Sequence, residues 1–232
     1  MEVQEFTLVL CRLRGVDREI RHRRILVFMS DIKEIVKEIE ELDEIFRKEG
    51  IPQEYKDKWN VDINVGIWAT GRKTAELLHQ LVLENKPQLI LELGTSVGYS
   101  TLFLADAARV YGGKITTIDR EEYKVEEAKE YLRRAGLDAN VDFLHGEIDD
   151  YLESWDKNVD FLFFDANKRG YLEQLQVLEP FLIDGAVIVA DNIADFPEQT
   201  KDFVEYVTQN PAYDSEVLDI DHGVLVATYS AQ

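Results

Sequence analysis

The chain has 232 residues, of which 46 are Asp or Glu and 26 are Lys or Arg, so its formal net charge at pH 7 is −20. This acidity argues against a protein whose affinity comes from neutralising nucleic-acid phosphates or anionic lipid headgroups. The single cysteine, Cys11, excludes an internal disulfide framework and a cysteine-rich zinc site. The longest apolar runs are five residues, far below the roughly 20 that a membrane span needs. Because the first residues also lack the order of a signal peptide, we expect a cytoplasmic protein.

Residues 1–60 are expected to form an N-terminal arm and helical extension, and residues 61–232 the main domain. The start of the arm is locally basic, with six arginines between Arg12 and Arg24 in an otherwise acidic protein. Two interpretations are open. In one, Met29 is the true start of the protein and the preceding residues are an artefact of gene calling. In the other, the arm is real and packs on the domain or on a dimer partner.

A helix is predicted between Asp31 and Gly50. Its apolar residues recur at spacings of three and four, which places them on one face. Asp31 is expected to cap the helix, with Glu34 completing a capping box, and Gly50 followed by Pro52 to end it. The apolar face covers either its own domain or that of a partner, so a homodimer is one of the two expected states. A second helix is predicted over residues 70–84.

From Pro87 onward, short apolar strands alternate with amphipathic helices. Strands are predicted at 88–93, 114–118, 141–144, 159–164 and 186–190, and helices at 99–110, 124–135, 149–155, 171–181 and 198–208. Strands this apolar are buried on both faces, which indicates an α/β fold with a parallel sheet between two helical layers. The last two strands, at 215–220 and 223–228, are joined by a turn too short for a crossover and should pair antiparallel.

The strongest local motif is the segment LILELGTSVGYST at residues 89–101. A buried strand carries Glu92 near its end, and a turn containing Gly94 and Gly98 then opens a helix. Glycines here permit positive φ and a close approach of ligand to backbone. Asp119 ends the next strand, where a carboxylate can accept hydrogen bonds from ribose hydroxyls. A nicotinamide dehydrogenase is disfavoured because Ser96 occupies the place of the middle glycine of its fingerprint.

A second group of polar residues follows the next two strands. Asp165 ends one strand, with Lys168 three residues later, and Asp191-Asn192 ends the following strand. If these strand ends meet beside the glycine loop, two carboxylates and one amide oxygen converge, a ligand set that suits Mg²⁺ or another hard divalent cation. Each residue alone is equally explained as a helix cap or a turn residue. Asn167, between Asp165 and Lys168, is expected to face a substrate bound at this site.

With these motifs, the segment from about Asn64 to Thr228 resembles the class I S-adenosylmethionine-dependent methyltransferases. It is most similar to the catechol and caffeoyl-coenzyme A O-methyltransferases, whose metal-dependent members carry D-x-x-K and D-N after consecutive strands. The resemblance implies a seven-stranded Rossmann-like sheet, mostly parallel, with an antiparallel C-terminal pair. It also implies a cofactor, S-adenosylmethionine, and a small-molecule acceptor.

The resemblance assigns roles to individual residues. Those expected around the cofactor are Glu92, Gly94, Ser96, Gly98, Ser100, Asp119, Asp165 and, by a looser match at the adenine, Gly146, Glu147 and Ile148. The expected metal ligands are Asp165, Asp191 and Asn192. Lys168 would be the catalytic base if its pKa is lowered, or would stabilise a phenolate electrostatically if it stays protonated.

The predicted function is therefore metal-dependent methyl transfer to a hydroxyl of a small catechol-like or other metal-chelating acceptor. The regions that frame the acceptor in this family correspond to 59–70 and 193–197, where the match gives no sharp motif, although Trp68 is a candidate pocket wall. One alternative is methylation of a hydroxylated RNA nucleoside, supported only by the basic stretch Arg12 to Arg24 and opposed by the net charge. Another is a non-catalytic cofactor-binding scaffold, which would have no need of a complete metal-and-base set.

Overall fold

The computed structural model describes residues 32–61 and 65–231. The basic stretch from Arg12 to Arg24, the alternative start at Met29 and the expected cap Asp31 lie outside these residues. The first described helix, α3 (Lys33–Glu49), has Ile32 at its N-cap, and no side chain among the described residues caps it.

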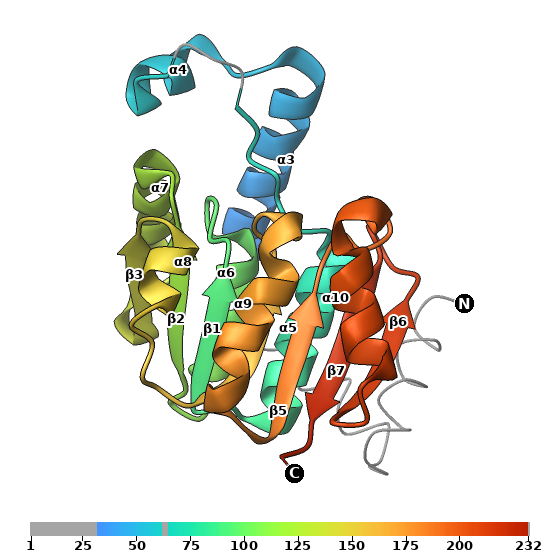
Figure 1. Ribbon diagram of the computed structural model, residues 1–232. Coiled ribbons are helices and arrows are strands. Elements are labelled where there is room, and N and C mark those ends of the chain that lie inside the picture. The colour runs from blue at the N-terminus through green and yellow to red at the C-terminus, as the bar shows by residue number, and fades with distance from the viewer. Residues whose placement is uncertain (1–31, 62–64, 232) are drawn as a thin grey trace, which may run out of the picture.

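One seven-stranded sheet forms the centre of the molecule (Figure 1). Its strand order is β3-β2-β1-β4-β5-β7-β6, and every pair is parallel except β5–β7 and β6–β7. This arrangement confirms the predicted sheet and its antiparallel C-terminal pair. The strands are β1 (Leu89–Leu93), β2 (Lys114–Asp119), β3 (Val141–His145), β4 (Val159–Phe164), β5 (Leu182–Ala190), β6 (Tyr213–Leu218) and β7 (Val224–Tyr229).

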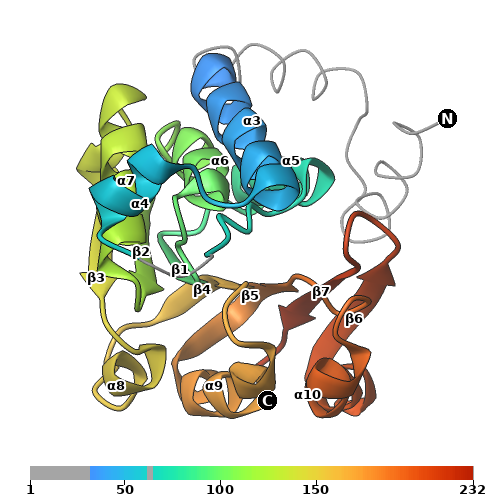
Figure 2. The same cartoon turned by 90° about the horizontal axis from the view of Figure 1, so that it is seen from above.

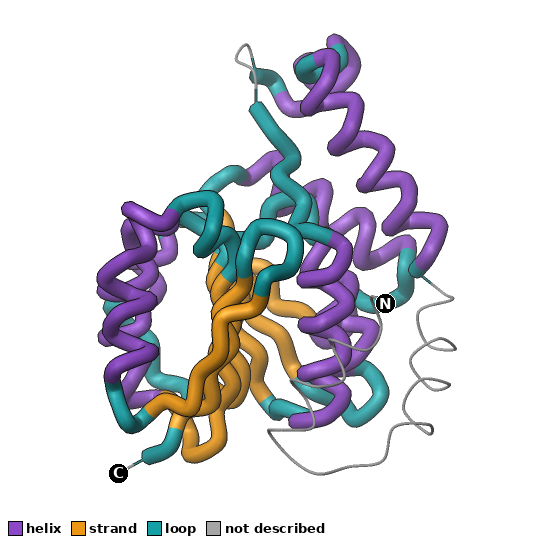
Figure 3. The backbone as a smooth tube through the Cα atoms, turned by 90° about the vertical axis from the view of Figure 1, so that its right-hand side faces the viewer, coloured by secondary structure: helices purple, strands orange, loops and turns teal. Residues whose placement is uncertain are grey.

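Helices cover both faces of the sheet (Figures 2 and 3). Seen from above, one face carries α5 (Arg72–Asn85), α6 (Tyr99–Ala108) and α7 (Glu122–Arg134), and the other carries α8 (Ile148–Leu152), α9 (Tyr171–Leu178) and α10 (Pro197–Gln209). Short 3₁₀ turns occupy Asp138–Asn140, Lys168–Gly170 and Glu179–Phe181. Within the described ranges, no helix is both long enough and apolar enough to cross a membrane.

The two-sided burial of the central strands explains their apolar sequences. On β1, Ile90 belongs to the core beneath α5 and α6, whereas Leu91 and Leu93 belong to the core on the opposite face. On β4, Phe163 and Phe164 likewise belong to opposite cores. The side chains of Ile90, Leu91, Phe163 and Phe164 are all fully buried. Successive side chains of a strand point to opposite faces, so a strand covered on both sides has no polar alternation.

Several predicted boundaries differ from the structure. β5 begins at Leu182 instead of residue 186, because Leu182 already pairs with Val159 of β4. The apolar pattern is weak at this end, since Ile183 and Asp184 are exposed. β6 runs two residues earlier than predicted and is a polar edge strand, which gives little hydrophobic signal. Helix α8 ends at Leu152, three residues before the predicted end.

The structure adds a helix that the sequence analysis did not predict, α4 (Gln53–Trp59). Its aromatic residues Tyr55 and Trp59 pack against Phe46 of α3, with ring centroids 5.4 and 5.6 Å from the Phe46 ring. The α3–α4 segment rises above the carboxyl end of the sheet (Figure 1). It is tied to α7, because the Trp59 indole and the Lys58 ammonium both donate to the carboxylate of Glu127.

Candidate functional site

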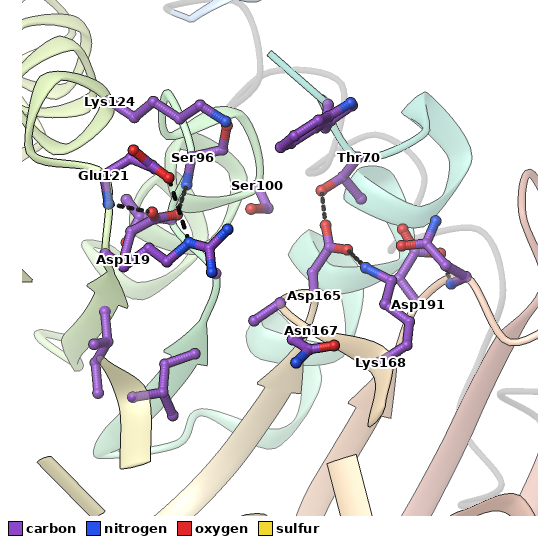
Figure 4. A pocket seen from close by; sticks show the side chains of 18 of the residues that line it. Thr70, Ser96, Ser100, Asp119, Glu121, Lys124, Asp165, Asn167, Lys168 and Asp191 are labelled. Atoms are coloured by element: carbon purple, nitrogen blue, oxygen red, sulfur yellow. Dashed lines mark hydrogen bonds and ion pairs between the residues drawn. The ribbon is translucent and has the colours of Figure 1, made fainter. Parts of the chain in front are cut away.

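A cavity of about 750 Å³ lies at the carboxyl ends of the parallel strands. Its walls come from the loops after β1, β2, β3, β4 and β5, and from the segment that precedes α5. Figure 4 shows Asp119 and Ser96 on one side of this space and Asp165, Lys168 and Asp191 on the other. Strands β1 and β4 are neighbours although strands β2 and β3 lie between them in sequence, so the cavity lies at the point where the strand order reverses.

The loop after β1 passes very close to the loop after β4. Gly94 has φ of +109°, and a Cβ atom built on it would lie 2.6 Å from the backbone oxygen of Asp165. A residue with a side chain would therefore be excluded twice, by backbone conformation and by space. This close crossing brings the glycine loop and the Asp165–Lys168 segment into one site.

Asp119 is held in a fixed orientation at the end of β2. Its Oδ2 accepts a hydrogen bond from the Ser96 amide at 2.7 Å, and its Oδ1 accepts one from the Glu121 amide at 3.0 Å. Its carboxylate lines the cavity, and each oxygen keeps a second lone pair for a ligand. The arrangement therefore joins the glycine loop to the end of β2 through one side chain.

Glu92, expected to lie around the cofactor, is not on the cavity wall. It is fully buried behind the loop, where it accepts hydrogen bonds from Ser100 at 2.5 Å, Thr101 at 2.6 Å and Thr117 at 2.7 Å. Burial raises the pKa of its carboxyl to about 7, although the three hydroxyl groups oppose this shift. Glu92 thus supports the loop and orients Ser100, which does line the cavity. Gly98 likewise lies behind the wall, packed on Ala128.

Asp165 connects three segments of the chain. Its Oδ1 lies 3.0 Å from the Lys168 ammonium, and its Oδ2 accepts a hydrogen bond from Thr70 Oγ1 at 3.0 Å. Burial raises the pKa of the Asp165 carboxyl, against the opposing effects of Lys168 and Thr70. All three side chains line the cavity, so a lysine, a carboxylate and a hydroxyl are held together at its floor.

Asp191 has one carboxylate oxygen without a partner. Its Oδ1 accepts a hydrogen bond from the Asn192 amide at 2.8 Å, but Oδ2 is buried and unbonded within the described structure. Burial, followed by the negative charge of Asp165, raises its pKa to about 8. The buried carboxylates of Asp165 and Asp191 repel one another, and Oδ2 of Asp191 is free to bind a ligand. A bound cation would stabilise this pair. In the described ranges, no three His, Cys, Asp or Glu side chains cluster for a metal, so Asn192 would be needed as the third protein ligand.

The remaining predicted residues also lie on the cavity wall. Gly146, Glu147 and Ile148 line it near Asp119, and Asn192 lines it beside Asp191. Asn167 is on the wall too, but its Oδ1 accepts a hydrogen bond from the Arg169 amide at 3.3 Å, so it also caps the following turn. Of the two framing regions, Trp68 and Phe196 contribute exposed rings, whereas Trp59 is buried away from the cavity.

Other wall residues were not identified from the sequence, notably Thr70, Lys124 and His222. His222 Nδ1 lies 2.8 Å from Asp195 Oδ2, and both residues line the cavity. Thr70 and Lys124 carry no motif, since a threonine before a helix and a lysine among glutamates are ordinary at a surface. Only the fold brings them to the site.

Comparisons with known proteins agree with this geometry. Residues 91–193 match a family model described as a methyltransferase domain. The human transmembrane O-methyltransferase is 33% identical over 144 residues, covering 59% of this chain and 48% of the relative. Bovine catechol O-methyltransferase is 29% identical over 156 residues, covering 63% of this chain and 56% of the relative. The chain therefore spans about half the length of the curated relatives it matches.

Solved structures show the same fold. The O-methyltransferase TomG from Streptomyces achromogenes superposes with a TM-score of 0.69 at 20% identity, covering 100% of both chains. The Bacillus cereus O-methyltransferase gives a TM-score of 0.66 at 21% identity, covering 81% of this chain and 96% of the other. These comparisons agree with the resemblance seen in the sequence: residues 91–193 match a methyltransferase-domain model, and the chain has the fold of these solved O-methyltransferases.

Proposed function

We propose that the protein transfers a methyl group from S-adenosylmethionine to a hydroxyl group of a small, metal-chelating aromatic acceptor, with a divalent cation such as Mg²⁺. The observation that carries the proposal is the convergence, in one cavity, of Asp119, the Asp165–Lys168 pair and the vacant oxygen of Asp191. A nucleotide-binding scaffold would need the first of these features but not the other two.

The residues of the glycine loop fit an adenosyl cofactor. Asp119 is oriented by two backbone amides, so its free lone pairs can accept from ribose hydroxyls without further ordering. Ser96 and Ser100 present polar groups to the same space, and Ile148 offers an apolar contact for a base. When bound, S-adenosylmethionine supplies a methyl group on a positively charged sulfur.

Asp165, Asp191 and Asn192 would hold the cation. All their donor atoms are oxygens, as Mg²⁺ prefers, and the repulsion between the two buried carboxylates would be relieved by a bound positive charge. A bound cation lowers the pKa of a chelated hydroxyl, which ordinarily is about 10 for a phenol. The acceptor would thereby reach its reactive, deprotonated form near neutral pH.

Lys168 is placed to handle the proton or the charge of the acceptor hydroxyl. Its side chain is 13% exposed and is fixed by the ion pair with Asp165, so Nζ stays beside the proposed cation site. As a neutral amine it would accept the hydroxyl proton, and as an ammonium it would stabilise the oxygen anion. Both roles require the same position.

The outer wall of the cavity suits a flat acceptor. Phe196 and Trp68 are two of the large apolar side chains that remain exposed, at 40% and 69%, and both line the cavity. Exposed aromatic rings at a cavity mouth commonly cover an apolar ligand and exclude water from it. Asn167 lines the same cavity, where its amide can contact polar groups of the acceptor.

The test is methyl transfer measured by mass spectrometry with a panel of vicinal dihydroxy aromatic compounds, in Mg²⁺ buffer and with a chelator. We expect a product heavier by one methylene group, formed with Mg²⁺ and lost with the chelator. Matched monohydroxy compounds serve as controls because they cannot chelate. A hydroxylated RNA substrate is assayed in parallel.

Calorimetric titration of S-adenosylmethionine into the protein is the first experiment, because it tests whether the proposed cofactor binds. Micromolar affinity, equivalent to about −8 kcal/mol, is expected. If no binding is detected at roughly millimolar ligand, the proposed S-adenosylmethionine-dependent mechanism is rejected. Binding without methylation of any acceptor would instead favour the scaffold, and exclusive methylation of RNA would favour the nucleoside alternative.

A further inference from the structure

Lys124 is a buried cation on the wall of the cavity. It is the third residue of α7, its side chain is almost completely buried at 3% exposure, and it lines the same space as Asp119 and Ser96. Figure 4 shows its side chain extending from α7 toward Ser96. Burial lowers its pKa, against the opposing effects of the carboxylates of Asp119 and Glu121.

Four Lys or Arg side chains line the cavity in the part of the chain that the structure describes, and Lys124 is the exception among them. Arg47 is paired with Asp43 at 2.7 Å, Arg120 with Glu121 at 3.3 Å, and Lys168 with Asp165 at 3.0 Å. Lys124 has no ion pair or hydrogen bond with any described residue. Its ammonium instead lies over the Trp68 ring, 4.2 Å from the centroid.

This placement is unfavourable for the protein without a ligand. A cation in the first turn of a helix opposes the helix dipole, and a buried ammonium without a partner loses hydration that nothing replaces. The face of an indole compensates only part of that loss. An unpaired buried charge of this kind indicates a binding group whose partner is an anion.

The backbone also fixes the ring that covers Lys124. Trp68 has φ of +50°, a conformation that a residue with a side chain seldom adopts. A Cβ atom on Gly66 would lie 2.3 Å from Trp68 Nε1, so the absence of a side chain at Gly66 leaves room for the indole in this orientation. Trp68 is 69% exposed, so its ring is held on the cavity wall without being part of the core. The segment thus keeps one aromatic face on the Lys124 ammonium.

We propose that Lys124 binds the α-carboxylate of the methionine moiety of the cofactor, with Trp68 covering the ion pair. This inference rests on the proposed function, in which Asp119 holds the ribose. S-adenosylmethionine carries one anionic group, its carboxylate, at the end remote from the adenine. Ser96 and Ser100 line the same cavity, but their hydroxyl protons are already donated to the Ile67 carbonyl and to Glu92, so Lys124 is the side chain that can donate to the carboxylate. A ribose contact would leave the positive charge of Lys124 unused.

The test compares two ligands that differ by the carboxylate alone, S-adenosylmethionine and decarboxylated S-adenosylmethionine, by calorimetry with wild type and Lys124→Met. Methionine keeps an unbranched stem beneath Trp68 and removes the charge. We expect Lys124→Met to weaken S-adenosylmethionine binding at least tenfold, equivalent to about 1.4 kcal/mol, and to change binding of the decarboxylated ligand less than twofold. Lys124→Arg should stay within threefold of wild type for both.

Lys129→Met is the matched control, because Lys129 is on the same helix but is paired with Glu126 and lies away from the cavity. It should leave both affinities unchanged. Thermal unfolding supplies a second measurement. A structural role would make Lys124→Met less stable, whereas removal of an unpaired buried charge should leave the melting temperature of the ligand-free protein equal or higher.

Equal weakening of both ligands would overturn the proposal and indicate a ribose or structural contact. Unchanged affinity for both would overturn it in favour of an anion on the acceptor. Failure of wild type to bind either ligand would remove the proposed function itself. If wild type binds both ligands equally well and Lys124→Met has the same affinities, the carboxylate contact is rejected. The proposed methyl transfer would not be affected by that result.

Discussion

The ammonium of Lys168 lies 3.0 Å from Oδ1 of Asp165, and both side chains are nearly buried, at 13% and 12% exposure. The same carboxylate accepts from Thr70, so Asp165 fixes the lysine from one side and the segment before α5 from the other. The ion pair fixes the orientation of the lysine side chain, which lines the cavity. The proposed chemistry depends on that orientation.

Replacing Lys168 should separate catalysis from cofactor binding. We expect Lys168→Ala to lower turnover by about 10²-fold or more, the usual contribution of a positioned proton acceptor, while cofactor affinity stays within about threefold. The free energy of unfolding should also fall, by about 3 kcal/mol, because Asp165 is left as an unpaired buried charge. Turnover, calorimetry and urea unfolding measure the three effects. Lys201→Ala, on the exposed surface of α10, is the control, and equal losses of turnover and affinity would contradict the assigned role.

Asp191 should determine the response to a divalent cation. A ligand that binds only the folded protein stabilises it by mass action, so Mg²⁺ should raise the melting temperature of wild type. Asp191→Asn should abolish that rise. In metal-free buffer, the same variant should be more stable than wild type because its repulsion with Asp165 is removed.

Differential scanning calorimetry with and without MgCl₂ checks both parts of this prediction. Asp195→Asn is the matched control, since Asp195 lines the same cavity but pairs with His222 and is not a proposed ligand. An Asp191→Asn protein that keeps the full Mg²⁺ response would rule out Asp191 as a ligand.

Much of this site could be predicted because parallel strands end at a common edge. β4 has the predicted bounds, 159–164, and Asp165 follows it directly, so an apolar run alone located a chemically important carboxylate. Asp119 and Asp191 were located in the same way, from the ends of β2 and β5. The two-residue shift of β6 has the opposite cause, because a polar edge strand lacks the apolar run that marks a boundary.

The residues that could not be predicted reach the site through long-range contacts. Thr70 donates to a residue 95 positions away, and no local pattern specifies such a pair. Lys124 stands among glutamates at the start of an amphipathic helix, which is typical of a solvated position; its burial follows from the segment carrying Trp68. Glu92 was identified by its motif, but only the fold places it behind the loop instead of on the wall.

Helix α5 is capped by a residue from the other end of the chain. Its N-cap is Gly71, which has no side chain, and Asp221 instead accepts from the Thr74 amide at 2.8 Å and from Thr74 Oγ1 at 3.2 Å. We expect Asp221→Ala to lower the free energy of unfolding by about 1–2 kcal/mol, the usual cost of losing a cap. Asp221→Asn should lose less, because asparagine retains an acceptor and tolerates the positive φ of +43°. Urea unfolding measures both, and Asp219→Ala, at an exposed neighbouring position, should have little effect.

Glu92 should give the protein a specific dependence of stability on pH. Its pKa is about 7 in the folded protein against an ordinary 4.5, so between these values the folded state binds more protons than the unfolded state. The free energy of unfolding therefore decreases as pH rises from about 4.5 to 7, and this loss is complete above pH 7. At about 1.4 kcal/mol per pKa unit, the effect is at most about 3 kcal/mol.

Glu92→Gln removes this proton-binding group while retaining a side chain that can bond to Ser100, Thr101 and Thr117. Relative to wild type, the variant should therefore be more stable at pH 8 than it is at pH 5. The measurement is urea unfolding of both proteins at the two pH values, because the difference between proteins cancels the contributions of other acids. Glu173→Gln, on the exposed side of α9, is the control and should show no such difference. A stability difference between wild type and Glu92→Gln that is the same at pH 5 and pH 8 would mean that Glu92 ionises alike in the folded and unfolded states.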